Sequence, residues 1–460
     1  MGFFIYMNYQ TFLENKKHSI GNFGFDANYI PDIAFDFQKY IIEKAILKGR
    51  TAIFADTGLG KTLIQLSIAK NIINYTNKKV LILTPLAVAF QFILEAEKLG
   101  IDDIEYSKDG KHTKKIVVCN YERLHYFNEN DFVGVILDES SILKNFDGKI
   151  KNSITSFIKK IPYRFLSTAT PSPNDYIELG TSSEALGYLG YTDMLSKFFK
   201  NNGNSIDIRH AGCEWYIKPH AENDFWKWVS QWAISIRKPS DLGFSDERYN
   251  LPELIENKHM VKNNAILNSA NNQMQMFNMP AVNFFDIKKE TRNTLNERCE
   301  KAFDLSSKHD TSVYWVNLND EAKLLKSLDS NSFEIKGSMS IDQKEEMLIG
   351  FAKGDIKKLI TKTKITAFGL NWQHCNHTTY FPTYSYEQYY QAIRRFWRFG
   401  QKNNVTVDLV LSDGQTRIMD SLSVKKTKAN DMFTKLSQNV NSIYEIQKRE
   451  FTKEIIKPKF

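Results

Sequence analysis

Residues 51–66 read TAIFADTGLGKTLIQL. An apolar run of strand length leads into a glycine-rich turn, and an amphipathic helical pattern follows the turn. A phosphate-binding loop requires this order of strand, turn and helix. Gly58 and Gly60 would let the backbone N–H groups of the turn point into one cradle. Lys61 would reach the β- and γ-phosphate oxygens from the start of the helix, and the hydroxyl of Thr62 would bind Mg²⁺. A chance glycine-rich turn is the alternative, and the flanking elements argue against it.

Short β-branched runs alternate with helical patterns in the first half of the chain and again near its end. The first series comprises residues 51–55, 79–84, 115–119, 134–138 and 163–168, and the second comprises 312–317, 332–337, 357–362, 377–381 and 405–411. Such alternation predicts parallel sheets covered by helices. Two α/β lobes are the simplest account of the two series.

An acidic pair follows the apolar run GVILD at the end of a predicted strand. Asp138 and Glu139 form this pair. Alone, such a pair is more often a helix cap. Together with the phosphate-binding loop, the pair predicts that Asp138 holds Mg²⁺ through water and that Glu139 orients and deprotonates an attacking water.

The segment QAIRRFWRFG, residues 391–400, brings two arginines close to a glutamine. Gln391, Arg395 and Arg398 are spaced by four and three residues, which predicts that they share one face of a helix. Guanidinium groups suit the charge that spreads over a transferring phosphoryl group. A basic helix face that is solvated, or that lies on nucleic acid, is the alternative.

The bulk composition gives weaker expectations. The formal net charge of +8 over 460 residues favours a polyanionic partner, although an Asn- and Lys-rich composition bias would give the same charge. The four cysteines lie far apart, so neither a disulfide framework nor a zinc knuckle is indicated, and the run at 374–377 (HCNH) has poor spacing for a metal. No leader is predicted, because the start MGFFIYMNYQ lacks a basic n-region and a small-residue cleavage site. No membrane span is predicted, because the apolar stretch at 80–94 is interrupted and short. We therefore expect a cytoplasmic protein.

Tryptophans gather between the two predicted lobes, in the segment EWYIKPHAENDFWKWVSQWA at 214–233. Trp228 and Trp232 are four residues apart, which is the spacing of a buried helix stripe. Stacking of nucleobases is the alternative role for these rings. We favour core packing within a helical insertion.

These motifs, in this order, resemble those of superfamily 2 helicases, and most closely the Swi/Snf-type branch with its compact relatives carried by phages and prophages. The resemblance covers nearly the whole chain. The matching stretches are ADTGLGKT (55–62), LTPLAVAFQFILEAEK (83–98), CNYERL (119–124), DESSILKN (138–145), STATPSPND (167–175), IRKPSDLG (236–243), KGSMSIDQKEEMLIGFAKGD (336–355), TKTKITAFGLNWQHC (361–375) and YEQYYQAIRRFWRFGQ (386–401).

The resemblance implies two tandem RecA-like P-loop NTPase lobes that use ATP with Mg²⁺. It places lobe 1 at 1–180, a helical, aromatic-rich insertion with a connector at 181–250, lobe 2 at 251–435 and a basic tail at 436–460. It gives Gln38 the role of reading adenine. It also assigns the coupling of nucleotide to nucleic acid to Ser167, Thr168, Thr170, Gly369 and Asn371.

The resemblance further implies an ATPase motor that translocates on, remodels or unwinds DNA, double-stranded or branched, rather than RNA. We expect a monomer in the cytoplasm, which is the host cytoplasm if the chain is phage-encoded. An ATP-switched DNA clamp and a P-loop kinase for a small molecule are the alternatives, and the kinase would not need the second lobe. Ser141 stands where the family's second motif has His, so the role of that His is in doubt.

Overall fold

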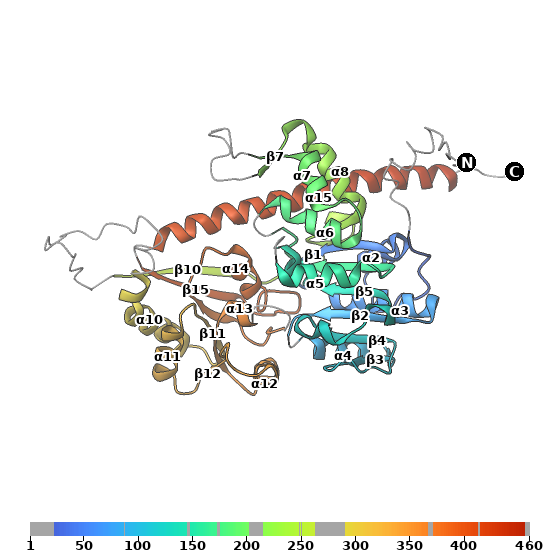
Figure 1. Ribbon diagram of the computed structural model, residues 1–460. Helices are drawn as coiled ribbons and strands as arrows, with labels where there is room; N and C mark the ends of the chain where they lie inside the picture. Colours follow the sequence, from blue (N-terminus) through green and yellow to red (C-terminus); the bar gives the residue numbers. More distant parts are fainter. Residues whose placement is uncertain are drawn as a thin grey trace, which may run out of the picture.

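The computed structural model consists of two α/β lobes that lie side by side (Figure 1). It describes residues 23–455 except 87, 145–147, 173–174, 202–214, 248, 250, 263–289, 367–370 and 413–414, and only the backbone is described over 440–455. The two lobes are the two α/β units that the alternating sequence pattern predicts, and each is built on a parallel sheet. The fold class of tandem RecA-like lobes is therefore confirmed.

The sheet of lobe 1, within the described residues, has seven parallel strands in the order β3-β4-β2-β5-β6-β1-β9. Its strands are β1 (Arg50–Ala55), β2 (Lys79–Thr84), β3 (Ile104–Tyr106), β4 (Ile116–Asn120), β5 (Phe132–Asp138), β6 (Tyr163–Thr168) and β9 (Ala233–Ile236). Its principal helices are α2 (Asp36–Lys48), α3 (Lys61–Thr76), α4 (Ala89–Lys98) and α5 (Lys149–Ile158).

Apolar residues occupy both faces of this sheet, as a parallel sheet covered by helices requires. Along β1, Ala52 and Phe54 pack into one hydrophobic core, whereas Ile53 and Ala55 pack into a second core on the opposite face. The central strands therefore read as continuous apolar runs in the sequence. Their carboxyl ends meet at one edge of the sheet, where the phosphate-binding loop and the acidic pair also lie.

The sheet of lobe 2, counted over the same described residues, has six parallel strands in the order β10-β15-β14-β11-β13-β12. Its strands are β10 (Leu254–Val261), β11 (Ser312–Trp315), β12 (Phe333–Glu334), β13 (Lys358–Thr361), β14 (His377–Tyr380) and β15 (Val405–Ser412). Its helices are α10 (Leu295–Ser307), α11 (Asn319–Leu328), α12 (Ile341–Lys353), α13 (Thr363–Thr366) and α14 (Tyr386–Ile393).

The aromatic-rich segment forms a helical layer on lobe 1. It comprises α6 (Leu179–Leu186), α7 (Tyr191–Phe198), the antiparallel pair β7 (Phe199–Asn201) and β8 (Trp215–Ile217), and α8 (Glu222–Trp232). Trp226 and Trp232 are 2% and 1% exposed and belong to the lobe 1 core, while Trp228 packs edge-on against Trp232 and stays half-buried. Core packing is therefore confirmed for this stripe. After α8 the chain rejoins the sheet of lobe 1, where β9 pairs with β1.

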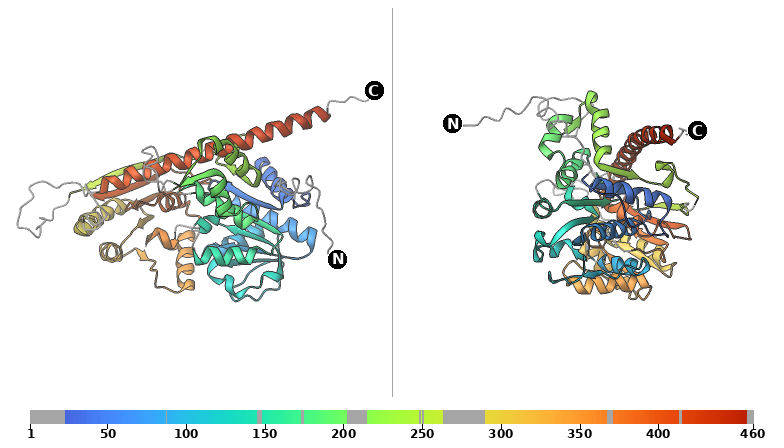
Figure 2. Two further views of the ribbon diagram at one scale, coloured as in Figure 1. Left: turned by 45° about the horizontal axis from the view of Figure 1, so that its top comes forward. Right: turned by 90° about the vertical axis from the view of Figure 1, so that its right-hand side faces the viewer.

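A single helix, α15 (Thr416–Ile455), runs along both lobes (Figure 2). Ile418 and Leu422 are buried in the core of lobe 2, whereas Met432, Phe433 and Leu436 are buried in the core of lobe 1. Lys435 makes an ion pair with Glu222 of α8. The segment that we expected to be a basic tail begins on this helix, and its start at 436 is still packed in lobe 1.

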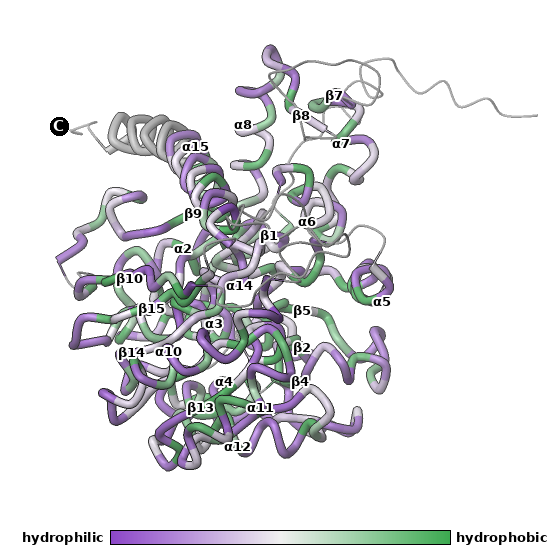
Figure 3. Tube along the Cα trace, turned by 90° about the vertical axis from the view of Figure 1, so that its left-hand side faces the viewer, coloured by the Kyte–Doolittle hydropathy of each residue, from purple (hydrophilic) through white to green (hydrophobic). Residues whose placement is uncertain are grey.

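The polar and apolar residues separate between surface and interior along the coloured part of the trace (Figure 3). Hydrophilic stretches follow the outer turns and helices, and apolar stretches follow the strands. Across the described residues, no helix has both the length and the apolar character that a membrane crossing would need.

Candidate active site between the two lobes

The phosphate-binding loop connects β1 to α3. Gly58 and Gly60 both adopt left-handed backbone angles, with φ of 87° and 77°, which side chains other than glycine rarely adopt. A Cβ atom at Gly58 would also lie 2.8 Å from the backbone nitrogen of Phe399 in lobe 2. Lys61 begins α3, and its Nζ donates hydrogen bonds of 2.9 Å and 3.2 Å to the carbonyl oxygens of Ala55 and Asp56. Both glycines therefore adopt the backbone that a phosphate-binding loop needs, and Lys61 lies at the start of the helix that follows it.

Asp138 lies at the end of β5, and neighbouring side chains hold its carboxylate in place. Gln65 Nε2, one turn into α3, donates a hydrogen bond of 2.7 Å to Oδ1, and Thr84 Oγ1 lies 3.5 Å from Oδ2. Burial raises the pKa of Asp138 to about 6, and the hydrogen bond from Gln65 opposes the rise. Asp138 is thus mostly ionised at neutral pH and takes up a proton near pH 6, which a bound cation would oppose.

Glu139 connects three of the predicted motifs. Its Oε1 atom accepts hydrogen bonds from Thr168 Oγ1 at 2.6 Å, Ser141 Oγ at 3.2 Å and Gln391 Nε2 at 3.4 Å. Its backbone is left-handed, with φ of 54°, which is uncommon for a residue other than glycine and often marks a functional site. Gln391 also donates to Thr170 Oγ1 at 3.2 Å, so one amide of lobe 2 reaches two motifs of lobe 1.

Ser141, which replaces the family's His, lies within this network. Its hydroxyl donates to Glu139. Burial raises the pKa of the nearby Glu387 carboxyl of α14, and the charge of Lys144 opposes the rise. Glu387 in turn makes an ion pair with Lys144 of lobe 1. The acidic motif is therefore tied to its neighbours without the His.

The two predicted arginines do not lie on a helix, which corrects the sequence-based prediction. Helix α14 ends at Ile393, and Arg395 and Arg398 lie on the turns that follow. Beyond Ile393, groups of this segment form hydrogen bonds with other parts of lobe 2. The carbonyl of Arg395 accepts a hydrogen bond from the backbone N–H of Trp372 at 3.0 Å, and Trp397 Nε1 donates to the carbonyl of Pro252 at 2.6 Å.

Both arginines nevertheless face the phosphate-binding loop. A cavity of about 310 Å³ between the lobes is lined by groups from each side. From lobe 1 these are Gly58, Gly60, Lys61, Thr62, Asp138 and Glu139, and from lobe 2 they are Asn371, Gln391, Arg394, Arg395 and Arg398. Burial lowers the pKa of Arg395, and the charge of Arg398 lowers it further, because the cavity gathers cations. Arg398 also donates a hydrogen bond to Asn371 Oδ1.

Four of the predicted residues lie behind this cavity and do not line it. Thr168 and Thr170 are buried and reach it through their hydrogen bonds to Glu139 and Gln391. Ser167 is buried on β6, and Gln38 donates from Nε2 to the carbonyl of Leu59 at 3.0 Å. Gln38 also accepts from the backbone N–H of Phe35 at 2.9 Å, so it braces the loop, and its reading of adenine stays a prediction. Gly369 lies outside the described residues.

The lining of the cavity fits a nucleoside triphosphate with a divalent cation. The carboxylate of Asp138 and the hydroxyl of Thr62 are the hard oxygen ligands that Mg²⁺ prefers, and Lys61, Arg395 and Arg398 suit the phosphate oxygens. Mg²⁺ in such a site neutralises charge that develops on the phosphates.

Comparison with protein-family models gives two matches. Residues 35–179 match the DEAD/DEAH box helicase family, and residues 294–400 match the helicase conserved C-terminal domain. The two matches together span more than half of the chain, one on each lobe. The chain belongs to the superfamily 2 helicases. Among curated proteins, a sequence search finds no significant match.

As a superfamily 2 helicase, the protein is an ATP-dependent nucleic-acid motor of the helicase type. The cavity between the lobes is the candidate site of ATP hydrolysis. The DEAD/DEAH box match contains Lys61, Asp138 and Glu139 of its lining, and the C-terminal match contains Gln391, Arg395 and Arg398.

Several residues of the helicase site were not found from the sequence. Gln65 could have been found, because it lies one helical turn after the phosphate-binding loop and faces the acidic strand end. Asp56 and Arg394 lie inside recognised motifs, but the sequence pattern gave neither of them a role of its own. Phe399, which covers Gly58, depends on how the lobes meet.

Proposed function

We propose that this helicase is a Swi/Snf-type translocase that moves along DNA, double-stranded or branched, at the expense of ATP with Mg²⁺. The resemblance of its motifs to the Swi/Snf-type branch supports the choice of DNA over RNA. On the same grounds we propose that it acts as a monomer in the cytoplasm, which is the host cytoplasm if the chain is phage-encoded.

One observation carries the proposal. Glu139 lines the nucleotide cavity and also lines a second cavity of about 530 Å³ at the lobe boundary, which we call the basic groove. The basic groove is lined by Pro85, Tyr121, Glu122, Glu139, Ser141, Ile142, Lys144, Gly148, Lys149, Ile150, Lys151, Lys364 and Glu387. The catalytic base therefore contacts both cavities, so a ligand in the basic groove can act on ATP hydrolysis directly.

The lysines of the basic groove suit a phosphate backbone. Lys149 of lobe 1 and Lys364 of lobe 2 are exposed, and within the described part of the chain no ion pair engages either of them. Lys144 and Lys151 are instead paired with Glu387 and Glu184. A sugar-phosphate strand that contacted Lys149 and Lys364 together would bridge the lobes, and its grip would change as the lobes move.

Steady-state ATP hydrolysis with and without DNA tests the proposal. We expect duplex DNA to raise the rate at least tenfold, and Lys61→Ala to remove turnover in both conditions. Lys149→Ala with Lys364→Ala should reduce the stimulation and weaken its salt dependence, since each lysine that neutralises a phosphate contributes to the salt slope. Lys308→Ala with Lys323→Ala, which changes exposed lysines at the end of α10 and on α11, is the matched control. An ATP hydrolysis rate that no polynucleotide changes would contradict the proposal and favour the hypothesis of a small-molecule kinase.

Movement is separated from clamping by displacement assays. A translocase displaces a third strand from a triplex without separating the duplex, whereas an unwinding helicase releases a strand of the duplex. An ATP-switched clamp would bind DNA in an ATP-dependent manner and would do neither. We expect triplex displacement that stops in the Glu139→Gln variant.

A further inference from the structure

Three arginines lie within five residues of lobe 2, and the first of them faces a different partner from the other two. Arg394 Nη2 makes an ion pair with Asp56 Oδ2, and the side chains of the pair are only 9% and 10% exposed. Asp56 belongs to the phosphate-binding loop of lobe 1. The pair is therefore a buried, charge-assisted contact between the lobes, which is the stronger kind of hydrogen bond.

Every donor nitrogen of Arg394 is engaged. Nε lies 3.3 Å from Tyr390 Oη, and Nη1 donates to the carbonyl of Trp397 at 3.2 Å, while Nη2 contacts Asp56. Its guanidinium also lies over the rings of Tyr390 and Trp397, at 5.4 Å and 4.7 Å from their centroids. Arg394 is thus fixed on Asp56, in contrast to the two arginines that point at the phosphate site.

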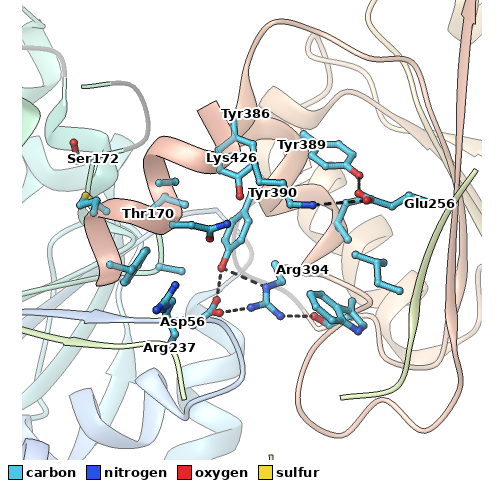
Figure 4. A pocket seen from close by; sticks show the side chains of 18 residues that line it. Asp56, Thr170, Ser172, Arg237, Glu256, Tyr386, Tyr389, Tyr390, Arg394 and Lys426 are labelled. Atoms are coloured by element: carbon cyan, nitrogen blue, oxygen red, sulfur yellow. Dashed lines mark hydrogen bonds and ion pairs between the residues drawn. The ribbon is translucent and has the colours of Figure 1, made fainter. Parts of the chain in front are cut away.

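The side chain of Asp56 lies outside the nucleotide cavity. Its side chain lines a separate cavity of about 300 Å³ between the lobes (Figure 4). It is not among the residues that line the nucleotide cavity. Oδ1 accepts hydrogen bonds from the backbone N–H of Thr57 at 2.6 Å and from Tyr390 Oη. Asp56 is therefore placed to hold the loop from behind and not to ligate Mg²⁺.

The backbone of the same residue contacts the catalytic lysine. The carbonyl oxygen of Asp56 accepts a hydrogen bond of 3.2 Å from Lys61 Nζ, and the backbone N–H of Asp56 donates to Ile236 at 2.9 Å. One residue thus contacts the sheet edge, the phosphate-binding lysine and lobe 2. A movement of lobe 2 relative to lobe 1 acts on the orientation of the loop through the Asp56 carboxylate.

We propose that Arg394 is a positioning residue that, through Asp56 and with the support of Tyr390, holds the phosphate-binding loop in its ATP-competent orientation when the lobes are closed. Arg394 also lines the nucleotide cavity, but each of its three nitrogens is engaged by a protein group, so it acts through the loop. The proposal rests on ATP hydrolysis between the lobes and not on the choice of nucleic acid. The contact raises the fraction of molecules that are competent to bind ATP. Its loss lowers this fraction, and the apparent affinity for ATP falls in the same proportion.

The experiment is a titration of basal ATP hydrolysis in four variants. Arg394→Gln and Asp56→Asn should each raise KM for ATP by roughly tenfold with kcat changed less than about twofold. Because the two groups act through one contact, the double variant should also show roughly a tenfold rise and not a hundredfold one. Arg292→Gln, which changes an exposed arginine near α10, is the matched control.

Conservative variants distinguish positioning from a general loss of structure. Arg394→Lys, which keeps the charge, should recover part of the loss in KM, and Tyr390→Phe, which keeps the ring, should raise KM less than Arg394→Gln does. Tyr390→Phe also serves as the test if Arg394→Gln does not fold. Small-angle scattering without nucleotide should show a larger radius of gyration for Arg394→Gln than for the wild type.

Three results would overturn the proposal: an unchanged KM in Arg394→Gln, a fall in kcat in place of a rise in KM, or effects on KM that multiply in the double variant. Basal turnover is used so that the two proposals can fail separately. A wild-type rate that DNA does not stimulate counts against the DNA motor and leaves the titration of the variants intact.

Discussion

Gln391 of lobe 2 donates a hydrogen bond of 3.4 Å from Nε2 to Oε1 of Glu139 in lobe 1. The carboxylate that is placed to activate water is therefore held by both lobes, because Thr168 of lobe 1 donates to the same oxygen. Any separation of the lobes removes Gln391, one of the three groups that donate to this oxygen, and leaves Thr168 and Ser141. Hydrolysis in this arrangement depends on closure, and closure is the movement that a motor of this class uses.

Glu139→Gln should stop hydrolysis while ATP still binds. The substitution keeps the shape of the side chain and removes the base, which contributes roughly 10²- to 10⁴-fold to proton transfer. Binding of a fluorescent ATP analogue and single-turnover hydrolysis check the two halves of this expectation. A variant that hydrolysed ATP at the wild-type rate would remove Glu139 from its role.

Gln391→Leu should reduce DNA-stimulated hydrolysis more than basal hydrolysis. The change removes the hydrogen bonds from lobe 2 to Glu139 and Thr170, and we expect a fall of about tenfold in the stimulated rate. The comparison of kcat with and without DNA measures the difference. Gln231→Leu, at an exposed position of α8, is the matched control, and an equal loss in both conditions would argue against coupling through Gln391.

Arg398→Ala should lower kcat by roughly 10³-fold, with a smaller effect on nucleotide affinity. A guanidinium that meets charge on the transferring phosphoryl group acts mainly on the transition state. Pre-steady-state kinetics separate the hydrolysis step from binding, and Arg292→Ala tests the loss of an exposed arginine. If Arg398→Ala weakened ATP binding and left kcat unchanged, the arginine would be a binding group only.

The hydrolysis rate should fall as the pH drops below about 6. Burial raises the pKa of Asp138 to about 6, so below that pH the carboxyl carries a proton and no longer binds Mg²⁺ well. Mg²⁺ with nucleotide competes with the proton and should move the midpoint to lower pH.

Because ATP itself titrates in this range, the ¹³C chemical shift of the Asp138 carboxyl is the specific readout of this pH dependence. The Asp138→Asn variant assigns the signal. A midpoint near 4 without Mg²⁺ would show that the carboxyl is not perturbed and would contradict the prediction.

The strands that carry the site could be predicted from the sequence, because each is buried on both faces and therefore reads as an apolar run. All ten predicted strands are present, including β1 before the phosphate-binding loop and β5 before the acidic pair. The signal of β10 is weaker, because this strand lies at the edge of its sheet and four of its eight residues are exposed. β9 was not found, because it follows the aromatic-rich segment and its pairing with β1 depends on long-range contact.

The site residues were predicted where a local pattern carries the chemistry. Lys61 and Glu139 follow from a loop and a strand end, whereas the helical face predicted for Arg395 and Arg398 was wrong. A spacing of three or four residues is compatible with a helix, but α14 ends at Ile393. The spacing gives no sign of the hydrogen bond that the carbonyl of Arg395 accepts from the backbone N–H of Trp372. The pairing of Asp56 with Arg394 is outside the reach of any local pattern, since 338 positions separate the two residues.

The central claim is that one triphosphate is held by Lys61 from one lobe and by Arg398 from the other. A crystal structure with Mg²⁺, ADP and an aluminium fluoride mimic of the γ-phosphate tests it most directly. We expect Lys61 Nζ and the Arg398 guanidinium within hydrogen-bonding distance of the same mimic, with Glu139 facing the attacking water. A structure in which ADP and the mimic are bound to Lys61 while Arg398 faces away from them would contradict the claim.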